Sequence, residues 1–159
     1  IAIVDEEGNQ VGGCCKPTSE LKLHLQVYRM REDIGGIVHA HPPYLTAHAV
    51  CGLPVRTKAY PEMMVMYGSF EVAGYGRPGT DDICREVEPL LQKSNVVLLE
   101  NHGALAVGPD VVQAMNHMEA AEAIAEVLTM AKLVGKEKDL SPEECEALLA
   151  LHAEKQRGK

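Results

Sequence analysis

The chain has few aromatic side chains, since its 159 residues include no tryptophan and only one phenylalanine. Aliphatic residues must therefore fill most of the hydrophobic core, helped by seven methionines whose flexible side chains fit irregular gaps. Apolar residues nevertheless make up 46% of the sequence. That fraction excludes a disordered tail, and the length is that of one ordinary globular domain.

Basic residues are scarce relative to acidic ones, with 15 Lys and Arg against 23 Asp and Glu and a formal net charge of -8 at pH 7. A chain of this charge is a poor partner for the phosphate backbone of a nucleic acid. Long hydrophobic runs are also missing, because none approaches the roughly 18 residues of a membrane-spanning helix. No basic segment followed by an apolar one marks a secretion signal. We expect a cytoplasmic protein that binds neither nucleic acid nor membrane.

Repeats, low-complexity tracts and CxxC motifs are absent as well. The five cysteines are therefore expected to be reduced thiols and not zinc ligands; they are Cys14, Cys15, Cys51, Cys84 and Cys145. Residues 1–159 are expected to form a single domain. Because the sequence starts on the apolar run 1–4, which reads as a strand already inside a domain, we also expect a missing N-terminal segment.

Apolar runs typical of strands alternate with patterns typical of helices. Strands are predicted at 1–4, 10–12, 37–41, 69–72, 96–99 and 104–107, the first two as a hairpin. Helices are predicted from 18 or 19 to about 31, at 44–51, from 80 to about 93, at 110–133 and from 141. The rest of 53–79 is expected to be loop because prolines and glycines interrupt it. This interleaving predicts an α/β protein.

Three histidines and one carboxylate are the candidate functional groups. His39 and His41 share one face of a strand and are spaced to bind one metal ion, although such pairs also line polar sheet faces. His102 interrupts an apolar strand within Asn-His-Gly, which suggests a site, although a turn histidine bonded to a carbonyl would be the simpler interpretation if His102 stood alone. Glu20, in the first turn of a helix, could reach the same metal or merely complement the helix dipole. Together, three imidazoles and a carboxylate would leave zinc free to polarise a substrate carbonyl.

Separate blocks of sequence carry a resemblance to a known family. These are Thr18-Ser19-Glu20, His39-Ala40-His41 with the following proline, Asn101-His102-Gly103 and the start of the last helix at 140–144. In type and order the blocks resemble the class II aldolase/adducin family, over almost the whole chain. The resemblance implies a three-layer α/β/α fold with a central, largely antiparallel sheet. It also implies a homotetramer with active sites between neighbouring subunits.

The resemblance further implies roles for individual residues. His39, His41 and His102 would bind one zinc ion per chain. Glu20 would be the catalytic acid and base, and could also contact the zinc when no substrate is bound.

Other roles concern the substrate, a phosphorylated sugar. The hydroxyls of Thr18 and Ser19 match a pair that holds its phosphate, although simple helix capping fits them equally well. Tyr60 matches a tyrosine that assists protonation at the aldehyde oxygen. The family's phosphate loop would precede Ile1, and a tyrosine expected in its C-terminal tail has no counterpart here, since the last tyrosine is Tyr75.

Within the family, the spacing of the blocks is most similar to the aldolases that cleave L-fuculose 1-phosphate. The implied reaction is zinc-dependent cleavage of a ketose 1-phosphate to dihydroxyacetone phosphate and a short aldehyde such as L-lactaldehyde. A methylthioribulose-1-phosphate dehydratase would use the same histidines. A ribulose-phosphate 4-epimerase is less similar, because it has aspartate at the position of Glu20 and a longer interval between His41 and His102. A non-catalytic, adducin-like binding module would be expected to lose the metal residues.

Overall fold

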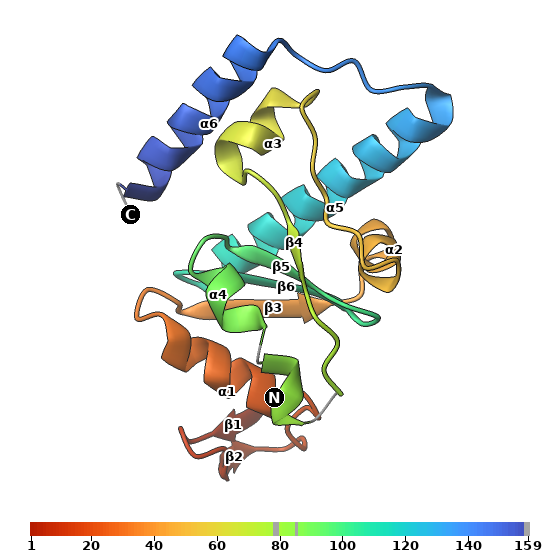
Figure 1. Cartoon of the computed structure of the whole chain (residues 1–159). Helices are drawn as coiled ribbons and strands as arrows, with labels where there is room; N and C mark the ends of the chain where they lie inside the picture. The colour runs from red at the N-terminus through yellow and green to blue at the C-terminus, as the bar shows by residue number, and fades with distance from the viewer. Residues whose placement is uncertain (78–79, 85, 158–159) are drawn as a thin grey trace.

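The fold alternates strands and helices along the chain (Figure 1). The computed structural model describes residues 1–77, 80–84 and 86–157. The strands are β1 (Ala2–Val4), β2 (Gln10–Gly13), β3 (Gly36–Ala40), β4 (Glu71–Ala73), β5 (Val96–Leu99) and β6 (Gly103–Gly108). The helices are α1 (Leu21–Met30), α2 (Pro43–Val50), α3 (Pro61–Met66), the 3-10 helix η1 (Asp81–Cys84), α4 (Val87–Leu91), α5 (Val111–Val134) and α6 (Pro142–Arg157).

A four-stranded sheet in the order β3-β6-β5-β4 forms the middle of the molecule. The pairs β3/β6 and β6/β5 are antiparallel, and β5/β4 is parallel. The expected central, largely antiparallel sheet is therefore confirmed. β1 and β2 form a separate antiparallel hairpin, also as predicted.

Alternate residues of the sheet contact two different groups of helices. Ala104 and Ala106 of β6 lie in a core cluster with residues of α2 and α5. Leu105 and Val107 lie in a second cluster with residues of α1, η1 and α4. Because neighbouring residues of a strand point to opposite faces, the sheet is covered on both sides. Figure 1 shows α1 below the sheet and α5 above it, which completes the three expected layers.

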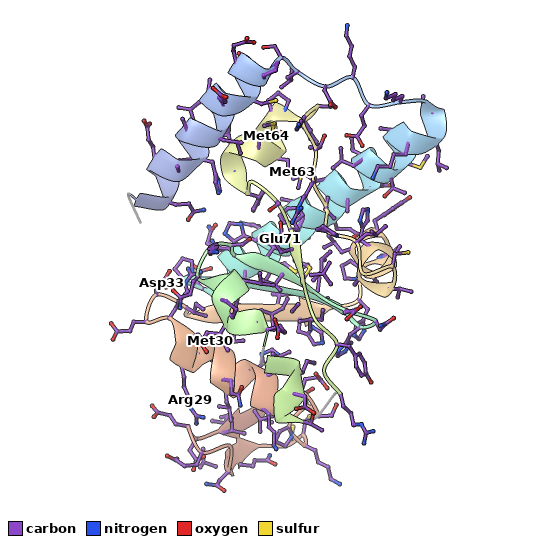
Figure 2. The ribbon with its side chains drawn as sticks, viewed as in Figure 1. Arg29, Met30, Asp33, Met63, Met64 and Glu71 are labelled. Atoms are coloured by element: carbon purple, nitrogen blue, oxygen red, sulfur yellow. The ribbon has the colours of Figure 1, made fainter. Side chains whose placement is uncertain are left out.

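Two parts of the predicted secondary structure were wrong. Residues 61–66 form the helix α3 where a loop was expected; Pro61 occupies its first position, where a missing N–H does no harm, and Met63 and Met64 are buried (Figure 2). The helix predicted from 80 to about 93 is two short helices, η1 and α4. Pro89 cannot continue a long helix because its ring collides with the carbonyl four residues earlier, but it fits the first turn of α4. The predictions for positions 78, 79 and 85 lie outside the described residues.

The last helix packs against α3 through Met64, Cys145 and Leu148. It starts as predicted, with the Ser141 hydroxyl accepting a hydrogen bond from the Glu144 N–H at 3.2 Å. Among the helices of the described residues, none combines the length and the apolar character needed to cross a membrane.

Candidate metal centre

Three histidines from two separate parts of the sheet meet in one place. His39 lies in β3, His41 follows it, and His102 lies in the turn between β5 and β6. One ring nitrogen of each lies within 4.8 Å of the corresponding atoms of the other two. The ring centroids are 4.8 Å apart for His39 and His102 and 5.0 Å apart for His41 and His102. Antiparallel pairing of β3 with β6 brings the two sequence blocks together.

His39 has one ring nitrogen fixed and the other free. Nδ1 lies 2.9 Å from the carbonyl oxygen of Ala104, which can only accept, so Nδ1 carries the hydrogen. Nε2 is then an acceptor, and it is buried without a hydrogen-bond partner among the described residues. In histidines that bind metals, a hydrogen bond from the ring nitrogen that does not bind the ion orients the ring and fixes the tautomer.

His102 is held by a tight turn. Asn101 has a φ of 56°, a left-handed conformation that asparagine tolerates better than most residues. Its N–H donates to Ala49 and the N–H of His102 donates to Leu99, both at 3.0 Å. The Nδ1 atom of His102 is buried and, within the described chain, has no hydrogen-bond partner.

His41 packs closely over Gly103. A Cβ atom on Gly103 would lie 2.5 Å from Cδ2 of His41 and 2.6 Å from the carbonyl oxygen of Ala40. Real Cβ atoms do not approach other atoms this closely, so only glycine leaves room for the ring. The glycine of the Asn-His-Gly motif is thus explained by space for a second histidine.

Glu20 is a buried carboxyl group beside this cluster, with 9% of its surface exposed. It is the residue just before α1, and not in the first turn as predicted. Its Oε2 atom has no hydrogen-bond partner in the described part of the chain. The carboxylate is not among the atoms that converge within 4.8 Å. Its negative charge nevertheless reaches His102, where it acts to raise the pKa.

The environment of His102 favours its neutral form by lowering its pKa. Burial lowers the pKa of His102 most, the neighbouring His39 lowers it further, and Glu20 only partly opposes them. A neutral imidazole is the form that binds a metal ion.

The unpartnered atoms fit a metal ion. Four buried side-chain polar atoms of the described residues lack a hydrogen-bond partner, and three of them belong to His39, His102 and Glu20. Buried polar atoms without partners are rare because each is destabilising. A divalent ion such as Zn²⁺, for which imidazole nitrogen is a common ligand, would provide the partner that the two ring nitrogens lack.

The other predicted site residues lie in two different parts of the fold. Thr18 and Ser19 are exposed and directly precede Glu20, whose N–H donates to the Thr18 hydroxyl at 3.2 Å. Tyr60 immediately precedes α3 and packs against the α2/α5 cluster. His39 points to the opposite face of the sheet, because it pairs with Leu105 of the α1/α4 cluster. Within one chain, Tyr60 is therefore not part of the histidine site.

His24 also belongs to this region, although no sequence motif singles it out. It lies one turn after Glu20 on α1, and its N–H donates to the Glu20 carbonyl at 3.2 Å. Burial lowers its pKa most, His39 lowers it further, and Glu20 raises it. The spacing of four residues from Glu20 on a helix was the available signal.

Comparison with known proteins identifies the family. The domain described as "Class II Aldolase and Adducin N-terminal domain" matches residues 1–129. An L-fuculose phosphate aldolase of Methanococcus maripaludis is 32% identical over 127 residues, which cover 80% of this chain and 68% of the relative. A 5-deoxy-D-ribulose 1-phosphate aldolase of Bacillus thuringiensis is 32% identical over 149 residues, covering 93% and 69%.

Solved structures agree with these relatives. A structure of L-fuculose 1-phosphate aldolase matches with a TM-score of 0.81 at 32% identity, covering 94% of this chain and 70% of that one. The L-fuculose-1-phosphate aldolase of Thermus thermophilus matches with a TM-score of 0.70 at 25% identity, covering 82% and 68%. The chain therefore belongs to the class II aldolase and adducin family.

Proposed function

We propose that this chain is a zinc-dependent aldolase that cleaves a ketose 1-phosphate of the L-fuculose 1-phosphate type to dihydroxyacetone phosphate and a short aldehyde such as L-lactaldehyde. One observation carries the proposal. Three imidazoles converge within 4.8 Å, two of them with a buried and unpartnered nitrogen, beside a buried carboxylate. The aldolases among the relatives support the choice of reaction.

The histidines would hold the metal ion. Zinc bound by His39, His41 and His102 would act as a Lewis acid that polarises the C2 carbonyl and stabilises the negative charge that develops when the C3–C4 bond breaks. His39 enters this site with its tautomer fixed by Ala104, so its Nε2 needs no rearrangement to act as a ligand.

Glu20 would transfer the proton at C3. In the cleavage direction the C4 hydroxyl loses its proton, the C3–C4 bond breaks to release the aldehyde, and C3 receives a proton from Glu20. In the condensation direction Glu20 removes that proton. The buried Oε2 atom, which has no partner among the described residues, is suited to this exchange.

Thr18 and Ser19 would bind the substrate phosphate. Both are exposed hydroxyl residues that directly precede Glu20, the N-cap residue of the 10-residue helix α1. The N-terminal end of a helix favours an anion through its free N–H groups and its dipole. The phosphate would then be bound by residues that adjoin Glu20 in the sequence.

Tyr60 would act at the aldehyde oxygen, and this role requires assembly. Because Tyr60 packs on the face of the sheet opposite to His39, it would have to enter the site of a neighbouring subunit. We therefore propose a homotetramer whose active sites lie between subunits, as the family resemblance implies.

A second substrate is favoured by one relative. The Bacillus thuringiensis protein named 5-deoxy-D-ribulose 1-phosphate aldolase matches 93% of this chain. That substrate differs from the first only in the part that becomes the aldehyde, and its cleavage would release acetaldehyde. The proposed metal site and Glu20 would serve both reactions unchanged.

Metal content and product release test the proposal together. Protein purified in the presence of Zn²⁺ is analysed for bound metal and assayed for dihydroxyacetone phosphate release from each of the two ketose phosphates. We expect about one zinc per chain and release that is lost in His41→Ala, whereas Glu20→Gln retains zinc and loses release. Zinc without release from either substrate would favour a dehydratase or an epimerase. Protein that binds no metal would refute the catalytic proposal.

A further inference from the structure

The helix α2, which follows His39 and His41 in the sequence, has no N-terminal cap of its own. α2 is preceded by Pro42 and begins with Pro43, and neither proline can cap the helix with its side chain. The next N–H groups, those of Tyr44 and Leu45, would be left without intrahelical partners. Thr46 is the first residue whose N–H finds one, the carbonyl of Pro42 at 2.9 Å.

Glu122, in the middle of α5, supplies the missing cap. Its Oε1 accepts the N–H of Tyr44 at 2.8 Å and its Oε2 accepts the N–H of Leu45 at 2.9 Å. Each carboxylate oxygen therefore satisfies one first-turn N–H. The interaction is charge-assisted, and the negative charge lies at the positive end of the helix dipole.

The connection from this capped end back to His41 is short and stiff. Only Pro42, with φ -68° and ψ 142°, separates His41 from the first residue of α2. Proline fixes its own φ and also restricts the residue before it. The position of the start of α2 therefore determines the position of the His41 backbone.

The three histidines are held by different means. His39 lies within β3 and is fixed by its bond to Ala104. His102 lies in a turn fixed by backbone hydrogen bonds. His41 lies beyond the end of β3, is exposed, and packs over Gly103 on one side. Its ring also stacks on that of His102, with the centroids 5.0 Å apart, and its backbone is tied to α2 through Pro42.

We propose that Glu122 is a positioning residue that keeps His41 in place to bind the metal ion, by anchoring the start of α2 to α5. This inference rests on the proposed metal-dependent function. Glu122 touches neither metal nor substrate in this role, and acts only through Pro42 and the backbone of His41.

A neighbouring acid provides a matched control. Glu119 lies one turn before Glu122 on α5, and both line a cavity of about 490 Å³ that also reaches His41 and Pro42. Glu119 is exposed, and the N–H groups of Tyr44 and Leu45 bond to Glu122. The variants Glu122→Gln and Glu119→Gln remove the same charge from the same helix face, but only the first removes an acceptor from the cap.

The experiment measures metal binding directly. Metal-free wild type and both variants are titrated with Co²⁺, and the affinity and the visible absorption of the bound ion are recorded, because this absorption reports ligand geometry. Far-UV circular dichroism and thermal unfolding of the metal-free proteins monitor the fold. Glutamine keeps one acceptor oxygen, so Glu122→Gln is expected to retain its helices.

We expect Glu122→Gln to bind Co²⁺ about tenfold more weakly, with an altered visible spectrum, and Glu119→Gln to match the wild type. Equal affinity and equal spectra for Glu122→Gln and the wild type would overturn the inference while leaving the metal site intact. Equal weakening in both variants would also overturn it, because the loss would then follow from charge alone. If the wild type bound no metal, the proposed function would fail, and the inference with it.

Discussion

The Nδ1 atom of His39 is hydrogen-bonded to the carbonyl oxygen of Ala104, on the strand beside it, at a distance of 2.9 Å. The same strand β6 begins at Gly103, over which the ring of His41 packs. One strand thus fixes the tautomer of one histidine and leaves room for another. The candidate metal site is therefore sensitive to changes in β6, even where the changed residue is not a ligand.

Replacing Gly103 with alanine should weaken metal binding. The new Cβ would lie 2.5 Å from the His41 ring and 2.6 Å from a backbone oxygen, so the ring or the strand must move. We expect metal affinity to fall about tenfold or more and the fold to lose about 1 to 3 kcal/mol. Co²⁺ titration and thermal unfolding measure the two effects. Gly135→Ala is the control, because nothing lies within 4 Å of its added Cβ; an equal loss there would contradict the explanation.

Removing the metal should destabilise the protein. An ion that binds only the folded chain stabilises it by about 2.7 kcal/mol when its free concentration is 100 times its Kd. Scanning calorimetry with added Zn²⁺ and with a chelator should show a higher Tm in the first case. The variant His39→Ala should show little difference between the two conditions. A Tm that does not respond to chelation in the wild type would contradict a site formed by these histidines.

Mixed assemblies should show whether Tyr60 acts across a subunit interface. Glu20→Gln and Tyr60→Phe are each expected to lower activity in a uniform assembly. If every site takes Glu20 from one subunit and Tyr60 from another, random mixing of the two variants restores about a quarter of the sites. Co-expression followed by the cleavage assay measures this recovery. No recovery would mean that Tyr60 does not complete a neighbour's site.

The ion pair between Arg56 and Glu71 should make the stability of the fold depend on pH in the acid range. The hydrogen bond from Arg56 lowers the pKa of Glu71 below its ordinary value of 4.5. The Glu71 carboxylate therefore binds a proton more readily in the unfolded chain than in the folded one. The ion pair thus contributes to the free energy of unfolding above about pH 4.5, and this contribution is lost as the pH falls through the folded-state pKa.

Urea unfolding at several pH values tests that dependence. At neutral pH, the free energy of unfolding of Glu71→Gln should be lower than that of the wild type by less than about 1 kcal/mol, since Arg56 is exposed and Glu71 is partly exposed. On acidification, the free energy of unfolding of the variant should fall less than that of the wild type. Glu88→Gln, which changes an exposed acid on α4, serves as the control. Parallel pH curves for the wild type and Glu71→Gln would contradict the assignment.

The sequence by itself determined the long, regular elements and the identity of the site residues. β5, β6 and α5 follow from continuous apolar runs and helical periodicity, signals that depend on local sequence. The motifs around His39, His41 and His102 named the metal candidates because histidines are distinctive in such strands and turns. The short helix α3 was not predicted because a proline is compatible with a loop and with a helix start alike. A helix was predicted over the residues of α4, but its separation from η1 was missed.

Only the tertiary structure decided which of these groups meet. The strand order β3-β6-β5-β4 places His102 beside His39, although 62 residues of chain lie between the two histidines. The same folding puts Tyr60 on the other face of the sheet and brings Glu122 to the start of α2. Neither placement leaves a local pattern, because each depends on how distant segments pack against a common core. The residue types were readable in the sequence, and their distances were set by that packing.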